Sequence, residues 1–129
     1  MTFCLDTTVA IELRDDVDSI IDLVERLAAP VFISVLTRIE LENGVVAVRG
    51  EDRRVRRVRV DAMLRSLPTL SFDADCVAAY KGIVEAAGFS RRKLVDRMIA
   101  AQALVRSATL VTLNGRDFRD VPGLKLLEW

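Results

Sequence analysis

The chain has 129 residues, no histidine and a formal net charge of zero, with 51% hydrophobic and 29% charged residues. This composition excludes a disordered chain and a coiled coil, and the length suffices for one domain with a proper core. We therefore expect residues 1–129 to form a single domain. No apolar run is long enough to span a membrane, and Asp6 and Glu12 interrupt any secretory signal, so we expect a cytoplasmic protein.

Short apolar runs alternate with longer helical patterns, which indicates an α/β domain with a mostly parallel sheet. In chain order we expect a strand at 2–5, a helix at 17–28 and a strand at 31–33. Next come a helix from Ser34 or Thr37 to about residue 44 and a charged helix at 51–67. The remaining elements are a strand at 68–72, helices at 74–87 and 94–107, and strands at 109–112 and 124–127.

The charges are unevenly distributed along the chain. Residues 1–48 carry nine acids against three bases, whereas residues 49–67 carry seven arginines against three acids. An arginine block of this kind can attract nucleic acid. It contains an apolar stripe that includes Val55 and Val58, which favours a solvated helix face. Cys4 and Cys76 are too few and too far apart for a disulfide scaffold or a zinc site, and we interpret them as small buried hydrophobes.

Four acids follow strands or lie near the N-terminal ends of expected helices. Asp6 comes directly after the first strand and Asp117 shortly after the strand at 109–112, while Glu40 and Asp96 lie early in their helices. Ligands of open parallel sheets bind at the carboxyl ends of strands, where strand order reverses. If the two strands are neighbours there, both acids face one crevice. Converging carboxylates are costly without a partner, and a hard divalent cation is the natural one.

Each acid taken alone has a simpler explanation. Asp6 could cap a helix that starts near Thr8, and Asp96 could be a first-turn acid favoured by the helix dipole. Glu40 could pair with a neighbouring arginine on an exposed face, and Asp117 could belong to a turn. Only the joint pattern favours function for all four.

Four segments in order resemble the motifs of a known family. Residues 5–9 around Asp6 and residues 33–41 around Glu40 resemble the beginning of PIN-domain ribonucleases. Residues 96–103 and 110–118 resemble the third and fourth motifs of that family, and the tail at 121–127 is similar to the closing strand of its VapC group. The resemblance implies a PIN-like three-layer α/β/α sandwich around a central, mostly parallel sheet of four to five strands.

The resemblance also implies an activity and partners. It implies a VapC-type toxin of a toxin–antitoxin pair: an Mg²⁺- or Mn²⁺-dependent endoribonuclease that cleaves structured RNA, often tRNA. Such proteins usually form homodimers, and a small DNA-binding antitoxin neutralises them. The family's catalytic and metal-binding acids fall on Asp6, Glu40, Asp96 and Asp117. Supporting polar residues fall on Thr112 and Asn114. Thr7 could hydrogen-bond the carboxylates or simply cap a helix. Arg92, Lys93 and Arg116 could contact RNA phosphates or could simply face solvent.

The missing histidine bears on the mechanism. Without histidine, general acid–base catalysis by imidazole is excluded, whereas one or two divalent ions can activate water and stabilise a leaving oxygen. We expect Asp6 and Asp96 as principal ligands, Asp117 completing the site, and Glu40 orienting the nucleophile. One alternative is a PIN-like RNA- or protein-binding scaffold with weak or no activity. A phosphoryl acceptor at Asp6 is less favoured, because Thr8 stands where a phosphatase-type motif has a second aspartate.

Overall fold

A computed structural model describes residues 1–129 and contains one five-stranded sheet in the order β3-β2-β1-β4-β5. Every neighbouring pair of strands is parallel. The strands are β1 (Phe3–Leu5), β2 (Val31–Ser34), β3 (Thr69–Leu70), β4 (Thr109–Thr112) and β5 (Lys125–Glu128). The expected parallel α/β architecture is therefore confirmed.

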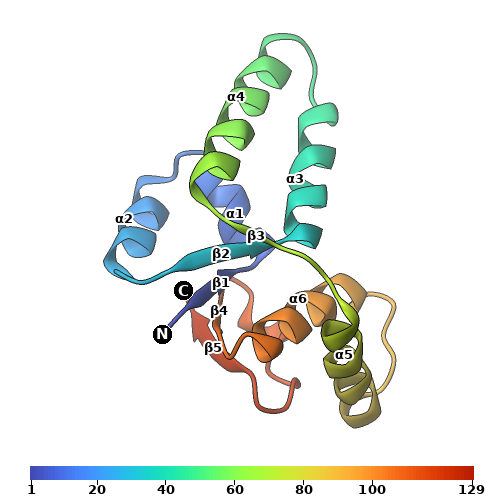
Figure 1. Cartoon of the computed structure of the whole chain (residues 1–129). Helices are drawn as coiled ribbons and strands as arrows, with labels where there is room; N and C mark the ends of the chain where they lie inside the picture. The colour runs from blue at the N-terminus through green and yellow to red at the C-terminus, as the bar shows by residue number, and fades with distance from the viewer.

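Helices cover both faces of this sheet, so the molecule has three layers (Figure 1). Helices α1 to α4 lie on one side, and α5 and α6 lie on the other (Figure 1). Their bounds are α1 (Thr7–Arg14), α2 (Asp18–Arg26), α3 (Val35–Val46), α4 (Gly50–Ser66), α5 (Ala74–Ala87) and α6 (Leu94–Val105), and a short 3-10 helix η1 (Gly115–Asp117) follows β4. None of these helices has the length and apolar character needed to cross a membrane.

Alternate residues of the buried strands point to opposite layers, as strand geometry requires. In β1, Phe3 and Leu5 join the core under α1 to α4, while Cys4 joins the core under α5 and α6. In β4, Val111 and Leu110 divide between the two cores in the same way. The central strands are thus buried on both faces, which explains why they read as continuous apolar runs.

Helix boundaries follow from local chemistry. Asp6, Ser34 and Asp73 each accept a backbone N–H in the first turn of α1, α3 and α5, which satisfies one of the free donors of each helix. Helix α5 ends at Gly88, whose φ of 82° lies in the left-handed region that glycine tolerates.

Most expected elements form with ends shifted by one or two residues, for example α6, which ends at Val105 rather than at residue 107, and three elements differ in a way that has a clear cause. Helix α1 was foreseen only as an alternative explanation of Asp6, and it forms. Helix α2 ends at Arg26 rather than at residue 28, because Ala28 adopts a positive φ of 48° before Pro30. The strand expected at 68–72 contains only Thr69 and Leu70, since it is an edge strand that pairs with β2 alone.

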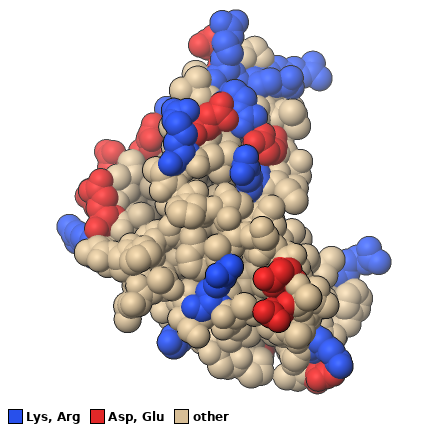
Figure 2. Space-filling model, viewed as in Figure 1, with Lys and Arg blue, Asp and Glu red and all other residues tan.

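The arginine block lies on α4 and is used mainly to hold α4 against α3. Arg53 donates to the carbonyl oxygens of Val46 and Val48, and Arg56 donates to that of Gly44, at the C-terminal end of α3. These carbonyls lack partners within the helix, so positively charged donors stabilise them. Arg57 binds the Glu42 carboxylate and Asp61. Figure 2 shows basic side chains gathered over α4, interspersed with acidic ones.

Candidate active site

The point where strand order reverses lies between β1 and β4. From β1 the chain adds β2 and β3 on one side and then returns to place β4 and β5 on the other. Leu5 of β1 is in register with Val111 of β4, and the Asp6 N–H donates to the Val111 carbonyl at 3.0 Å. The carboxyl ends of both strands therefore meet at one edge of the sheet. In open parallel sheets, ligands bind at such an edge, where the strand order reverses.

Asp6 is buried at this edge and is the most extensively hydrogen-bonded of the four acids. One carboxylate oxygen accepts from Thr8 Oγ1 at 2.6 Å and from the Val9 N–H at 3.1 Å. The other oxygen accepts from Thr112 Oγ1 on β4. Burial raises the pKa of Asp6, and the bonds from Thr112, Thr8 and Val9 partly offset that rise. The fold thus holds a carboxylate fixed in position with its charge only partly compensated.

Glu40 reaches the same edge from the second turn of α3. Thr7 Oγ1, at the start of α1, donates to Glu40 Oε1 at 3.1 Å and also lies 3.0 Å from Thr37 Oγ1. Much of Glu40 is exposed, but its carboxyl group is partly desolvated. That desolvation raises the pKa of Glu40, the Thr7 bond opposes the rise and the charge of Asp6 adds to it. The expected supporting role of Thr7 therefore has a direct contact.

Asp117 lies in η1, just beyond the end of β4. Asn114 Nδ2 donates to one of its oxygens, and Arg92 Nη1 lies 3.4 Å from the other. The Asn114 N–H in turn donates to Thr112 Oγ1 at 2.9 Å. Thr112 and Asn114 therefore connect Asp6 to Asp117 by a continuous chain of hydrogen bonds.

Asp96 lies in the first turn of α6 and shows that the four acids share one electrostatic field. Its pKa is raised to about 6, first by burial and then by the charges of Asp117, Asp6 and Glu40. The guanidinium of Arg92 acts in the opposite direction but does not cancel the rise. The structure thus brings all four predicted acids into one region, from α1, α3, α6 and η1.

The chemistry of this donor set fits a hard divalent cation, which prefers carboxylate oxygens and retains water ligands. The mutual repulsion felt at Asp96 is the charge that such a cation would neutralise. As placed, however, no three acidic, cysteine or histidine side chains converge closely enough to hold a metal ion. Like charges repel, and Asp6 and Asp117 instead take hydrogen bonds from Thr112 and Asn114. The acids form an open cluster rather than a closed cage.

Sequence reasoning gave no role to two features of this site. Thr8 both donates to Asp6 and accepts from the Leu113 N–H at 3.1 Å, so it ties α1 to the loop after β4. Asp120 binds Lys93 at 3.2 Å and the buried Arg97 at 3.1 Å. The contact of Thr8 with Asp6 could have been predicted from its position two residues after Asp6. No pattern in the sequence predicts the contacts of Asp120 with Lys93 and Arg97.

The candidate RNA contacts differ in their surroundings. Lys93 is mostly buried against Asp120. Arg92 is exposed and lies beside Asp117, at the acids. Arg116 is exposed, with no hydrogen bond or ion pair to its side chain.

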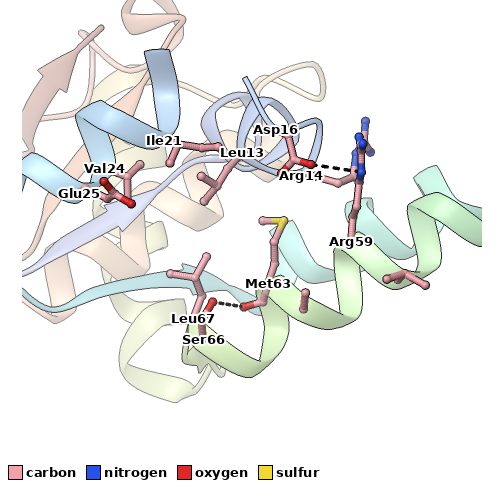
Figure 3. A pocket seen from close by; sticks show the side chains of 12 residues that line it. Leu13, Arg14, Asp16, Ile21, Val24, Glu25, Arg59, Met63, Ser66 and Leu67 are labelled. Carbon is pink, nitrogen blue, oxygen red and sulfur yellow. Dashed lines mark hydrogen bonds and ion pairs between the residues drawn. The ribbon is translucent and has the colours of Figure 1, made fainter. Parts of the chain in front are cut away.

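The largest cavity lies away from the acids, on the α1–α4 side of the sheet. Its volume is about 640 Å³, and its walls come from α1, α2, α4 and the residues next to them (Figure 3). An ion pair between Arg59 and Asp16, with 3.4 Å between the charged atoms, lies at its edge (Figure 3). Its apolar lining consists of Leu13, Ile21, Val24, Val58, Ala62, Met63 and Leu67.

Comparisons with known proteins agree with this geometry. Residues 3–124 match the PIN domain family. The chain is 28% identical to Ribonuclease VapC2 of Rickettsia felis, over 100% of this chain and 98% of that protein. It is 32% identical to Ribonuclease VapC1 of the same organism, over 74% of each chain.

Among solved structures, the chain is similar to the crystal structure of VapBC2 from Rickettsia felis bound to a DNA fragment from their promoter. The TM-score is 0.87 at 28% identity, with 100% of this chain and 99% of the other covered. The sheet order, the acids at the switch point and these similarities lead to one assignment. The chain belongs to the PIN-domain family, in the group that contains the VapC ribonucleases.

Proposed function

We propose that this protein is a metal-dependent endoribonuclease of the VapC type and the toxin of a toxin–antitoxin pair. The observation that carries the proposal is the shared field of Asp6, Glu40, Asp96 and Asp117 at the β1–β4 switch point, seen in the raised pKa of Asp96. A relative named a ribonuclease that is similar over the whole length, and a second one similar over 74% of the chain, support the reaction class. We also infer that residues 1–129 act as one domain, because one sheet supports both cores.

The residues divide the chemistry among them. Asp6 and Asp96 would hold the cation, Asp117 would complete its coordination, and Glu40 would orient the attacking water. Mg²⁺, or Mn²⁺ in its place, supplies the Lewis acid that makes water a better nucleophile and neutralises charge on the phosphate. The bonds from Thr8 and Thr112 favour the ionised form of Asp6, which is the form able to bind a cation.

RNA would reach the acids across a basic rim. Arg92 already lies beside Asp117, where a substrate phosphate would have to come, and Arg116 has no competing acidic partner. Both can therefore bind phosphate oxygens without first breaking a strong internal ion pair. Lys93 would contribute mainly through long-range attraction, since Asp120 holds its ammonium group.

The test is cleavage of total RNA by the parent protein and by Asp6→Asn, with Mg²⁺, with Mn²⁺ and with chelator. We expect cleavage by the parent that depends on the cation, and loss of cleavage in the variant. Asp22→Asn, which changes an exposed acid of α2, serves as the matched control and should cleave like the parent. Equal cleavage by parent and Asp6→Asn would refute the catalytic assignment, and a parent that binds RNA without cleaving it would favour a scaffold.

We further propose that a small antitoxin binds and inhibits this protein, and that the toxin forms a homodimer in the cytoplasm. Toxin–antitoxin complexes are among the structures that the chain resembles in fold. The cavity between α2 and α4 offers a place for an apolar segment of the antitoxin. Its lining combines apolar side chains with the charged residues Arg14, Asp16, Glu25 and Arg59, a combination that suits the binding of an amphipathic helix.

A further inference from the structure

The loop between α5 and α6, residues 88–93, carries an exposed aromatic ring and leads into α6, whose first turn contains Asp96. The side chain of Phe89 is 68% exposed, although phenylalanine is among the residues most often buried. Neither core cluster includes Phe89, so packing does not explain it. Isolated exposed apolar residues are common, so exposure alone carries no argument; the relevant observation is that the same loop contacts Asp117 through Arg92.

The loop is fixed on both sides of this ring. Arg97 donates to the Gly88 carbonyl oxygen, and the Lys93 N–H donates to Ser90 Oγ at 3.3 Å. Arg97 and Lys93 are themselves held by Asp120, in the segment that follows Asp117. The backbone around Phe89 is therefore tied to the same elements that carry Asp96 and Asp117.

Two arginines accompany the ring. Arg92 Nη1 lies 3.4 Å from Asp117, which places this loop at the mouth of the acid cluster. Arg91 is exposed, and its guanidinium has no hydrogen bond or ion pair within the chain. The loop therefore carries an exposed aromatic ring and two cationic side chains within four residues, and one of these cations lies beside Asp117 of the proposed cleavage site.

We propose that Phe89 is a base-stacking residue that, with Arg91 and Arg92, binds a single-stranded nucleotide next to the scissile phosphate. The proposal rests on the proposed ribonuclease function and names the part of the RNA that this edge of the site recognises. Single-stranded nucleic acid is bound by stacking of bases on aromatic side chains combined with a basic surface that follows the backbone. RNA can use all three side chains, because a base stacks on the ring while the flanking phosphates pair with the two arginines.

The experiment compares variants at position 89 in an Asp6→Asn background, which should bind RNA without cleaving it. Binding of a fluorescent single-stranded RNA and of its duplex is measured by anisotropy. We expect Phe89→Leu to weaken single-strand binding about tenfold, the effect of losing one stacked base, and to leave duplex binding unchanged. Phe89→Tyr should bind like the parent, because the aromatic face is kept.

The matched control is Val77→Ala. Val77 is also exposed, at 55%, but lies in the first turn of α5, roughly 15 Å along the helix from its end at Ala87 at 1.5 Å per residue. This variant should bind like the parent. Because Phe89 and Val77 are both on the surface, neither substitution should disturb folding.

The outcomes separate the two proposals. If the parent cleaves RNA but Phe89→Leu binds single strands as tightly as Phe89→Tyr, the stacking role is refuted and the ribonuclease function stands. A change in oligomeric state with unchanged RNA binding would also refute it, and would assign Phe89 to a protein interface. If the parent neither cleaves nor binds RNA, the proposed function fails and the stacking role fails with it.

Discussion

Asp96→Asn should stabilise the protein while abolishing its activity. The structure raises the Asp96 pKa from 3.8 to about 6, through burial and the charges of Asp117, Asp6 and Glu40. At 1.36 kcal/mol per pKa unit, ionised Asp96 would cost the folded state about 3 kcal/mol. The side chain is only half-buried, so solvent screening reduces this to about 1–2 kcal/mol. Asparagine has nearly the same shape and carries no charge, so it removes the cost.

The sign of the pH dependence follows from the raised pKa. Well below the ordinary pKa of 3.8, both the folded and the unfolded chain hold the Asp96 proton, and ionisation costs no stability. As pH rises from 3.8 toward 6 the unfolded chain loses this proton first, so the free energy of unfolding decreases. Once the folded carboxyl is also ionised, above its pKa of about 6, the loss of stability is complete. The stabilisation by Asp96→Asn should therefore be small near pH 4 and nearly complete by pH 7.5.

Urea denaturation at pH 4 and pH 7.5, each with and without Mg²⁺, measures these differences. In the parent, Mg²⁺ should raise the unfolding free energy at pH 7.5, because a cation that binds only the folded state stabilises it. In Asp96→Asn this effect should be much smaller. The inferred repulsion among the acids is refuted if the variant is no more stable than the parent at pH 7.5. It is also refuted if the substitution raises the free energy of unfolding equally at both pH values.

Two further changes test the supporting contacts and the partner surface. Thr112→Val removes the hydroxyl that donates to Asp6 and accepts from the Asn114 N–H. We therefore expect Mn²⁺ affinity and RNA cleavage to decrease about 10–100-fold, with little loss of folded protein. An unchanged Mn²⁺ affinity in a titration would contradict this. Val58→Asp places a charge at the wall of the α2–α4 cavity, where the native side chain is 65% exposed. It should prevent co-purification with the product of a short adjacent reading frame while leaving RNA cleavage intact, and normal co-purification would place the antitoxin elsewhere.

The sequence predicted the sheet and the location of the acids because both depend on local patterns. The apolar runs at 31–33 and 109–112 are buried on both faces, and such runs identify central parallel strands directly. Asp6 could be placed at a strand end from its neighbours alone. That β1 and β4 are adjacent was only a condition of the prediction, and the register of Leu5 with Val111 now confirms it.

Contacts over long sequence separations were not predictable. Asp120 accepts from Lys93 and Arg97, residues 27 and 23 positions earlier, and no periodic pattern relates them. The hydrogen bonds from Arg53 and Arg56 to carbonyl oxygens of α3 were not predictable for the same reason, since they depend on how closely α3 and α4 pack. An exposed helix face was the correct interpretation of this block, but the carbonyl contacts became visible only in three dimensions.

The distribution of positive charge around the acids explains how they remain available to a cation. Lys93 and Arg97 both lie close in sequence to Asp96, and either could have neutralised it. Both bind Asp120 instead; burial alone would raise the pKa of Asp120, but the hydrogen bonds and charges of these two residues hold it below its usual value. Arg92 is the only cation in contact with the cluster, and it is a long, exposed contact at 3.4 Å. Asp120 thus draws the nearest cations away from Asp96, and the repulsion left among the four acids comes from the charge that a bound divalent cation would neutralise.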